Sequence, residues 1–297
     1  MILSKNTGSS IVTTRFAPSP TGLLHLGHAY SALLSWRRAR DAGGRFVLRL
    51  EDIDPRRCRV DHAEAIQQDL AWLGMDWDGP VRIQSQHMPE YRAVLDKLRG
   101  QGLLYPCFCS RGDILREVAQ SSSAPHMAPD GALLYPGTCR RLDPGLRRSL
   151  LDEGAPHALR LDMQEALQRL DRSRPLSFED ADATGTARWQ PCRPAQFGDV
   201  VLSRRDAPAS YHLCVTHDDW VQGVSLVVRG EDLRAATGLH RLLQALSGWT
   251  PPAYSHHHLL RDAGGRRLAK RDQDRTLRTL REGGMTAPEV REAVGVG

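Results

Sequence analysis

The pattern of apolar and polar positions predicts a strand, a turn and a helix near the start of the chain. Apolar residues in 11–16 predict a buried strand, and small residues in 18–22 predict a turn. The helix is predicted from apolar residues at helical spacing and ends at Gly43-Gly44; its inner face is Leu26, Ala29, Tyr30, Leu33 and Leu34. Such a unit points backbone N–H groups and the positive end of a helix dipole at the turn. It therefore predicts a phosphate site, with His25 and His28 as further donors.

Three further apolar runs, at 46–50, 211–215 and 224–228, predict buried strands. Residues 110–194 are polar and punctuated by proline and glycine, which predicts an insertion between two halves of one parallel sheet. The chain is therefore expected to have an α/β fold. Its 297 residues are enough for two or three lobes.

Charged residues stand at the ends of the predicted strands. Glu51 follows 46–50, Arg229 follows 224–228, and Arg15 lies in the first strand. The carboxyl ends of parallel strands form the ligand-binding edge of an open α/β sheet. There Glu51 suits an ammonium group, and the two guanidinium groups suit a substrate with two carboxylates.

Each of these residues also has a purely structural interpretation. Glu51 fits a solvated acidic turn before the next helix. Arg229 fits a surface ion pair with Glu231 or Asp232, and Tyr211 fits a core aromatic position. The pattern alone leaves these alternatives open.

Two motifs carry a resemblance to the glutamyl branch of class I aminoacyl-tRNA synthetases. The sequence 18–28 contains Pro-Ser-Pro-Thr-Gly followed by His-x-Gly-His, which resembles the first signature of that class. The sequence 266–271 resembles the second signature, Lys-Met-Ser-Lys-Ser, although Arg267 replaces its first lysine and Ala269 its serine. A basic loop is otherwise a solvated surface segment. The resemblance implies a Rossmann-like catalytic domain and places Lys270 on ATP phosphates.

The resemblance also implies roles for individual residues. Those around the glutamate substrate are Arg15, Phe16, Ala17, Pro18, Ser19, Glu51, Tyr211 and Arg229. Those around ATP are Pro18, Thr21, Gly22, His25, Gly27, His28 and Lys270. His25, His28 and Lys270 are expected to be catalytic, with Mg²⁺ bound together with ATP.

The six cysteines include a group formed by Cys107, Cys109 and Cys139. We identify neither a signal peptide nor an apolar stretch long enough to span a membrane, which predicts a cytoplasmic protein with reduced thiols and no membrane partner. Grouped thiols then indicate one structural Zn²⁺, which needs a fourth ligand. The resemblance to glutamyl-queuosine tRNA(Asp) synthetases implies Tyr135 as that ligand, with His126 or water as alternatives. Three buried reduced thiols without metal remain the structural alternative.

The resemblance predicts the function and the division of the chain. Only 27 residues follow Lys270, whereas a discriminating glutamyl-tRNA synthetase continues into an anticodon-binding region. We therefore expect a monomer that activates L-glutamate with ATP and transfers it to queuosine of tRNA(Asp). A net charge of +5 is compatible with an RNA partner. The alternatives are a truncated glutamyl-tRNA synthetase charging tRNA(Glu), an inactive zinc-containing RNA-binding paralogue, and a general nucleotidyltransferase.

The expected division of the chain has five parts. They are a flexible tail at 1–10, the two halves of the catalytic domain at 11–106 and 195–250, an inserted zinc-bearing, acceptor-binding subdomain at 107–194, and a terminal segment with the Lys270 loop at 251–297.

Overall fold

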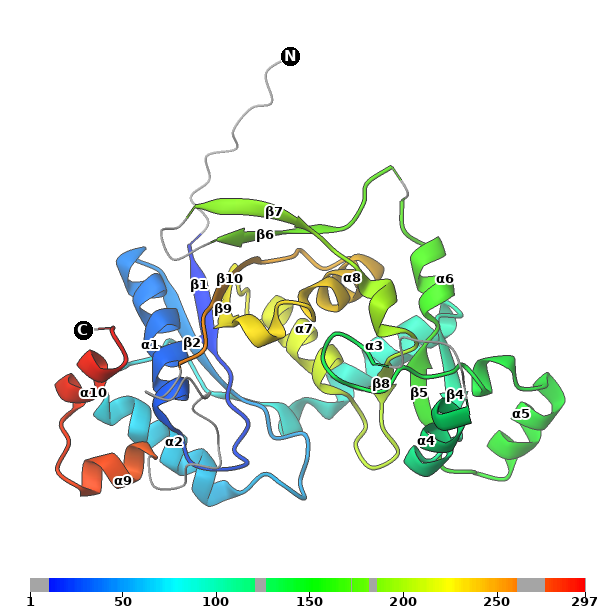
Figure 1. Cartoon of the computed structure of the whole chain (residues 1–297), viewed down its shortest axis with the longest axis horizontal. Helices are drawn as coiled ribbons and strands as arrows, with labels where there is room; N and C mark the ends of the chain where they lie inside the picture. Colours follow the sequence, from blue (N-terminus) through cyan, green and yellow to red (C-terminus); the bar gives the residue numbers. More distant parts are fainter. Residues whose placement is uncertain (1–10, 121–126, 172, 182–185, 261–275, 297) are drawn as a thin grey trace, which may run out of the picture.

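The computed structural model describes residues 11–120, 127–171, 173–181, 186–260 and 276–296 (Figure 1). The predicted tail at 1–10, His126 and Lys270 lie outside these ranges. Within them, no helix is both long enough and apolar enough to cross a membrane.

The first half of the parallel sheet has the strand order β1-β2-β3. Its strands are β1 (Thr13–Phe16), β2 (Arg45–Leu50) and β3 (Arg82–Ile83), and its helices are α1 (Leu26–Asp41) and α2 (Val60–Trp72). Phe46, Leu48 and Leu50 pack in one core with the apolar face of α1. Arg49 belongs to the other face, since successive side chains of a strand point to opposite sides. The predicted strand, turn and helix are confirmed.

The second half of the sheet has the order β7-β6-β10-β9. These strands are β6 (Ser177–Ala181), β7 (Ala187–Pro191), β9 (Leu226–Gly230) and β10 (Ala253–His257). The halves meet at β1 and β9, where Ser225 N donates to Thr13 O at 2.9 Å and Arg15 Nη1 donates to Val228 O at 3.0 Å. The prediction of a parallel α/β sheet assembled from distant parts of the chain is confirmed.

A separate antiparallel sheet with the order β4-β5-β8 lies at the opposite end of the molecule from α1 and α2 (Figure 1). Its strands are β4 (Leu104–Cys107), β5 (Ala158–Leu161) and β8 (Val201–Ser203), with α4 (Arg111–Gln120), α5 (Pro144–Asp152) and α6 (Met163–Gln168) around them. The range 107–194 therefore holds strands of two sheets, because the β6–β7 hairpin pairs with β10.

The segment 211–215, predicted as a strand, is the start of helix α7 (Tyr211–Val221), so that prediction was wrong. Ser210 caps the helix by accepting a hydrogen bond from Leu213 N. Residues 213–219 are all buried, so no polar face reveals the helical period. A short apolar run cannot distinguish such a helix from a strand.

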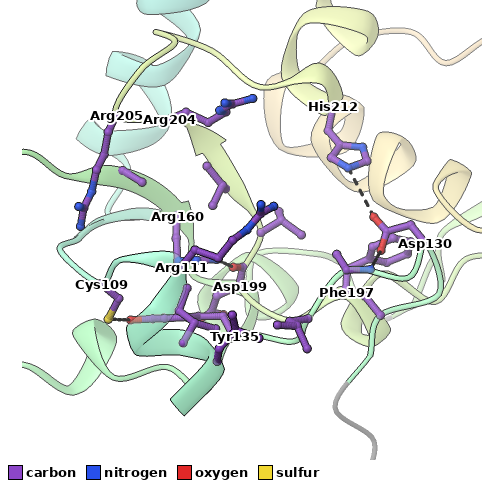
Figure 2. A pocket seen from close by; sticks show the side chains of 18 of the residues that line it. Cys109, Arg111, Asp130, Tyr135, Arg160, Phe197, Asp199, Arg204, Arg205 and His212 are labelled. Carbon is purple, nitrogen blue, oxygen red and sulfur yellow. Dashed lines mark hydrogen bonds and ion pairs between the residues drawn. The ribbon is translucent and has the colours of Figure 1, made fainter. Parts of the chain in front are cut away.

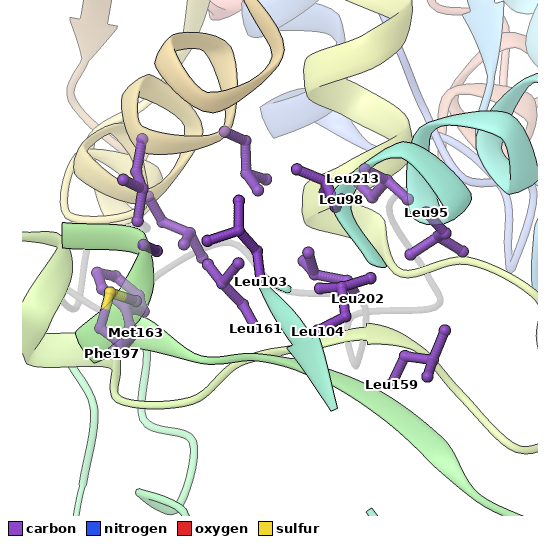
Figure 3. Close-up of a cluster of buried hydrophobic side chains, with 14 of the residues drawn as sticks. Leu95, Leu98, Leu103, Leu104, Leu159, Leu161, Met163, Phe197, Leu202 and Leu213 are labelled. Carbon is purple, nitrogen blue, oxygen red and sulfur yellow. The ribbon is translucent and has the colours of Figure 1, made fainter. Parts of the chain in front are cut away.

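Two hydrophobic cores hold these parts together. One, shown in Figure 3, joins the antiparallel sheet to α3 (Met88–Gly100), α7 and α8 (Thr237–Ser247) through side chains such as Leu98, Leu161 and Leu213. The other joins the first half of the parallel sheet to α9 (Leu277–Glu282) and α10 (Ala287–Ala293). The 3₁₀ helices are η1 (Gln84–His87), η2 (Cys139–Arg141), η3 (Pro194–Phe197) and η4 (Glu231–Leu233).

Candidate active site

A cavity of about 370 Å³ lies where β1, β2 and β9 end and α7 begins. It brings together every residue predicted to surround glutamate, namely Arg15, Phe16, Ala17, Pro18, Ser19, Glu51, Tyr211 and Arg229. His28 also lines it, so the first helix of the phosphate-binding unit borders the same space.

The two arginines of the cavity differ in what holds them. Arg15 is 5% exposed, and its Nε donates to Asp219 Oδ1 at 3.1 Å. Arg229 is 4% exposed and donates to neutral groups of Thr237, His240 and His256. Because Arg229 is buried and held in this way, the surface interpretation of this residue was wrong.

Glu51 is also buried, with 7% exposed, and lies 3.4 Å from Arg49 Nη2. Burial raises the pKa of its carboxyl to about 7, although Arg49 and Arg15 act in the opposite direction. An ammonium group bound beside Glu51 would favour the carboxylate form. The alternative of a solvated acidic turn is wrong for Glu51.

Tyr211 lines the cavity from the first turn of α7 rather than from a strand. Burial raises the pKa of its phenol to about 12, so the hydroxyl keeps its proton. It can therefore donate a hydrogen bond to an anionic ligand.

Sequence reasoning missed the carboxylates beneath the cavity. Asp218 is fully buried and Asp219 is 5% exposed, and both lie on α7. Arg49 Nη2 contacts Asp219 at 2.9 Å, and Arg82 Nε contacts Asp218 at 3.0 Å. The adjacent acidic pair in an apolar run was the available signal, but the assignment of a strand at 211–215 concealed it.

The predicted phosphate-binding turn leads into a helix that begins with a capping box. Gly27 N donates to His25 Nδ1 at 3.1 Å, and His25 N donates to His28 Nδ1 at 3.2 Å. Since both Nδ1 atoms accept, the proton of each neutral ring is on Nε2. Gly27 is required because a Cβ there would lie 2.9 Å from His25 Cε1.

The other residues predicted to bind ATP surround this unit. Pro18 lines the cavity of about 370 Å³, Thr21 lines a neighbouring cavity, and Gly22 lies between Thr21 and the helix in the sequence. Lys270 lies outside the described residues. The chain after it is anchored at the same place, because Thr276 pairs with His25 and Leu277 N donates to Leu24 O at 2.8 Å.

The grouped cysteines converge on one point beyond β4. The sulfur atoms of Cys107, Cys109 and Cys139 all lie within 4.8 Å of one another. The Tyr135 hydroxyl lies 3.3 Å from Cys109 Sγ and accepts a hydrogen bond from Cys139 N at 2.8 Å. A positive φ of 84° at Gly137 turns the chain between Tyr135 and Cys139. These four side chains form a compact set of three sulfur donors and one oxygen donor.

Burial and neighbouring groups affect the protonation of this cluster. Burial raises the pKa of Cys109 to about 12, so without a metal its thiol is neutral. Burial also raises the pKa of the Tyr135 phenol. The Arg160 guanidinium lies 3.8 Å from the centre of the Tyr135 ring, which favours negative charge on the phenol oxygen. Three thiols and a phenol match the tetrahedral coordination of Zn²⁺.

A larger cavity of about 970 Å³ opens beside the cysteine cluster (Figure 2). His212 and Asp130 lie on one side of it, and Cys109 and Tyr135 on another (Figure 2). Its basic residues are Arg111, Arg160, Arg204 and Arg205. Sequence reasoning did not single these out, since arginines spread over 111–205 of an arginine-rich chain form no recognisable motif.

A third cavity, of about 380 Å³, connects the first two by shared lining residues. It shares Ser19, Glu51 and Tyr211 with the cavity of about 370 Å³. It shares Arg204 and His212 with the large cavity. The three cavities therefore lie next to one another in a row from the parallel sheet to the cysteine cluster.

Comparison with known proteins identifies relatives along almost the whole chain. Residues 11–291 match the family model for the catalytic domain of class I tRNA synthetases (E and Q). The chain is 46% identical to a glutamyl-Q tRNA(Asp) synthetase of Rhodobacter capsulatus, over 95% of this chain and 99% of that protein. It is 41% identical to the protein of the same name from Nitratidesulfovibrio vulgaris, over 94% of this chain and 84% of that protein.

Solved structures agree with these relationships. A glutamate tRNA ligase of Elizabethkingia meningosepticum, solved with its amino acid, superimposes with a TM-score of 0.73 at 28% identity. The match covers 89% of this chain and 53% of the ligase, so the chain spans about half of that protein. The methionyl-tRNA synthetase of Mycobacterium tuberculosis, with a TM-score of 0.56 at 12% identity, shares the fold alone.

Proposed function

Because the chain belongs to the class I glutamyl and glutaminyl synthetase family, and within it to the glutamyl-Q tRNA(Asp) synthetases, we propose that it activates L-glutamate with ATP and transfers the glutamyl group to queuosine in tRNA(Asp). One observation carries this proposal. The cavity at the carboxyl edge of the sheet combines two buried arginines with a buried glutamate and is bordered by His28.

The cavity suits both ends of glutamate. Glu51 would bind the α-ammonium group, and Arg15 and Arg229 would bind carboxylates. A buried guanidinium rejects glutamine because an amide leaves its charge unpaired. The α-carboxylate oxygen attacks the α-phosphorus of ATP, the bond to the bridging oxygen breaks, and pyrophosphate leaves.

The start of α1 would hold the ATP phosphates. His25 and His28 each carry a proton on Nε2, so each can donate to an oxygen of the α-phosphate as charge develops there. Lys270, which precedes Thr276 in the sequence, would contact the leaving pyrophosphate. Mg²⁺ bound with ATP supplies further neutralisation of phosphate charge.

The row of cavities would admit the acceptor. A hydroxyl of the queuosine cyclopentenediol would reach the glutamyl-adenylate through the middle cavity, between Tyr211 and Arg204. The hydroxyl oxygen bonds to the activated carbonyl carbon, AMP leaves, and the proton passes to solvent. Arg111 and Arg205, in the large cavity, would face the RNA phosphates.

Cys107, Cys109, Tyr135 and Cys139 would hold one Zn²⁺. The metal would link the end of β4 to η2. It would so stiffen one wall of the large cavity of about 970 Å³, which we call the acceptor cavity. We place the reaction in the cytoplasm, where ATP, tRNA and reduced thiols occur together, and expect a monomer to perform it.

The decisive experiment combines amino-acid activation with transfer. We expect ATP–pyrophosphate exchange that depends on glutamate, and transfer of labelled glutamate to tRNA(Asp) with queuosine but not without it. Mapping the label to the wobble nucleotide would complete the test. Label at the 3′ end of tRNA(Glu) would instead identify a truncated glutamyl-tRNA synthetase. The absence of exchange would favour an RNA-binding paralogue.

A further inference from the structure

Arg229 is surrounded by hydrogen-bond acceptors that carry no charge. Its Nη2 donates to Thr237 Oγ1 at 2.7 Å, Nη1 to His240 Nδ1 at 3.2 Å, and Nε to His256 Nε2 at 3.3 Å. Thr237 and His240 are three residues apart on one side of α8. His256, on β10, is paired with Arg229, on β9. Among the described residues, no carboxylate oxygen lies within 4.0 Å of this guanidinium.

The directions of these hydrogen bonds determine where the protons of both imidazoles lie. Arginine only donates, so His240 Nδ1 and His256 Nε2 must be acceptors. The remaining proton of His240 is therefore on Nε2, which lies 3.2 Å from His212 Nδ1. That of His256 is on Nδ1, which lies 2.9 Å from Asp180 Oδ1. Both rings are neutral in this arrangement.

The environment keeps these rings neutral. Burial, and then the charge of Arg229, lower the pKa of His256 to about 4, against the opposing effect of Asp180. The same two causes hold the pKa of His240 well below its ordinary value. The series of side-chain contacts continues from His240 to His212, whose Nε2 lies 4.0 Å from Asp130 Oδ2. The arginine of the glutamate cavity is thus connected through two neutral imidazoles to the acceptor cavity.

Arg15 has a different environment. Asp219 is its ion-pair partner at 3.1 Å and also contacts Arg49 at 2.9 Å. The charge of Arg15 is therefore partly balanced within the protein. Within the described part of the chain the charge of Arg229 has no such balance, and three of its five N–H groups are used by neutral acceptors. One N–H on each terminal nitrogen remains for a ligand in the cavity that Arg229 lines.

We infer that Thr237, His240 and His256 are positioning residues that hold Arg229 in place without neutralising it, and so make the site selective for an acidic side chain. This inference rests on the proposed function. The α-carboxylate is the nucleophile and must move toward ATP, so the rigidly held Arg229 suits the side-chain carboxylate, which does not react. A protein carboxylate in place of any of the three acceptors would compete with the substrate.

The test compares two variants of the same size at His240. In His240→Asn the amide oxygen can replace Nδ1 as a neutral acceptor, whereas in His240→Asp a carboxylate stands at the same place. We expect His240→Asp to raise the KM for glutamate at least about thirtyfold and to lower discrimination against glutamine at least about tenfold. We expect His240→Asn to raise the KM less than about fivefold. Both would be measured by ATP–pyrophosphate exchange with each amino acid.

The outcomes separate this inference from the proposed function. Equal effects of the two variants on KM and on discrimination would overturn the inference, because the charge would then be irrelevant. If His240→Asp does not fold, the pair Thr237→Val and Thr237→Ser replaces it, and only the variant that keeps a hydroxyl should retain a low KM.

Failure of the unaltered protein to catalyse exchange with glutamate would reject the proposed function. Calorimetric titration of glutamate into each protein would still test the inference in that case.

Discussion

At the residue scale, the site is built from charges that have been removed from water. Arg49 is completely buried and contacts Glu51 and Asp219 on the underside of the cavity. A buried charge is tolerated only with close partners, so these groups constrain one another. Glu51 is at the edge of this network, next to the space that a substrate would occupy. Its protonation should therefore respond to the substrate.

The first prediction concerns the pH dependence of glutamate binding. Because the pKa of Glu51 is raised to about 7, its carboxylate is the minor form at pH 6 and the major form at pH 8. The amino group of free glutamate stays protonated over this range. We expect the KM for glutamate to fall about tenfold from pH 6 to pH 8. In Glu51→Gln the KM should be higher and flat, and an identical slope in that variant would contradict the assignment.

The second prediction concerns Lys270. On the proposed mechanism, its removal should weaken the stabilisation of the leaving pyrophosphate, because the positive charge of its ammonium group is lost. We expect Lys270→Ala to lower glutamate-dependent exchange at least about tenfold, or about 1.4 kcal/mol in the barrier. Exchange at the unaltered rate would remove Lys270 from the mechanism.

At the element scale, single features have a structural and a chemical role together. The capping box of α1 uses His25 and His28 to satisfy N–H groups at the start of the helix. The same bonds orient both rings and determine their tautomers. The cysteine cluster likewise connects β4 to η2 while forming one wall of the acceptor cavity.

The third prediction tests the cap. In Gly27→Ala the new Cβ would meet His25 Cε1 at 2.9 Å, so the imidazole must move. We expect kcat for exchange to fall at least about tenfold with little change in the melting temperature. The matched control is Gly100→Ala in α3, where a Cβ meets nothing within 4 Å. Equal activity of the two variants would show that the position of His25 does not matter.

The fourth prediction tests the metal. Protein purified without chelator should contain about one zinc per chain, because four donors converge at the cluster. Cys139→Ser should lose the zinc and melt at a lower temperature, whereas Cys58→Ala, outside the cluster, should keep it. A metal-free protein that remains folded and active would refute the structural role.

At the scale of the whole molecule, one core connects the antiparallel sheet β4-β5-β8 to the helices α3, α7 and α8. Leu161 on β5 and Leu213 on α7 are both fully buried in it (Figure 3). Residues of 107–194 therefore share a core with residues of 195–250. Such sharing favours unfolding as one unit rather than as separate parts.

The fifth prediction follows from that core. Leu161→Ala should lower the free energy of unfolding by about 2–5 kcal/mol, because a buried cavity replaces the side chain. Leu146→Ala in α5, where the side chain is half exposed, should change it by less than about 0.5 kcal/mol. Denaturant unfolding followed by fluorescence and by circular dichroism should give coincident transitions, and two separate transitions would contradict a common core.

Local patterns in the sequence were sufficient for β1, α1 and β2 of the parallel sheet, but β3 was not predicted. The strand at 11–16, the helix from Leu26 and the carboxylate after β2 depend on residues close in the chain, where periodicity and turn residues act directly. The helix α7 was missed because residues 213–219 are all buried. Apolar and exposed positions therefore do not alternate there with the 3.6-residue period of a helix.

The sequence by itself singled out the candidate residues: Arg15 lies in the first strand, Glu51 and Arg229 follow predicted strands, and the cysteines stand in a recognisable spacing. Only the tertiary structure decided how these groups act. Asp219 reaches Arg15 across 204 positions and Asp180 reaches His256 across 76, and a contact between residues so distant leaves no local pattern. Among the described residues, Arg15 has a carboxylate partner and Arg229 has none. This difference is a property of the assembled fold, because burial and neighbouring groups, which residue type does not fix, decide how a charged group interacts.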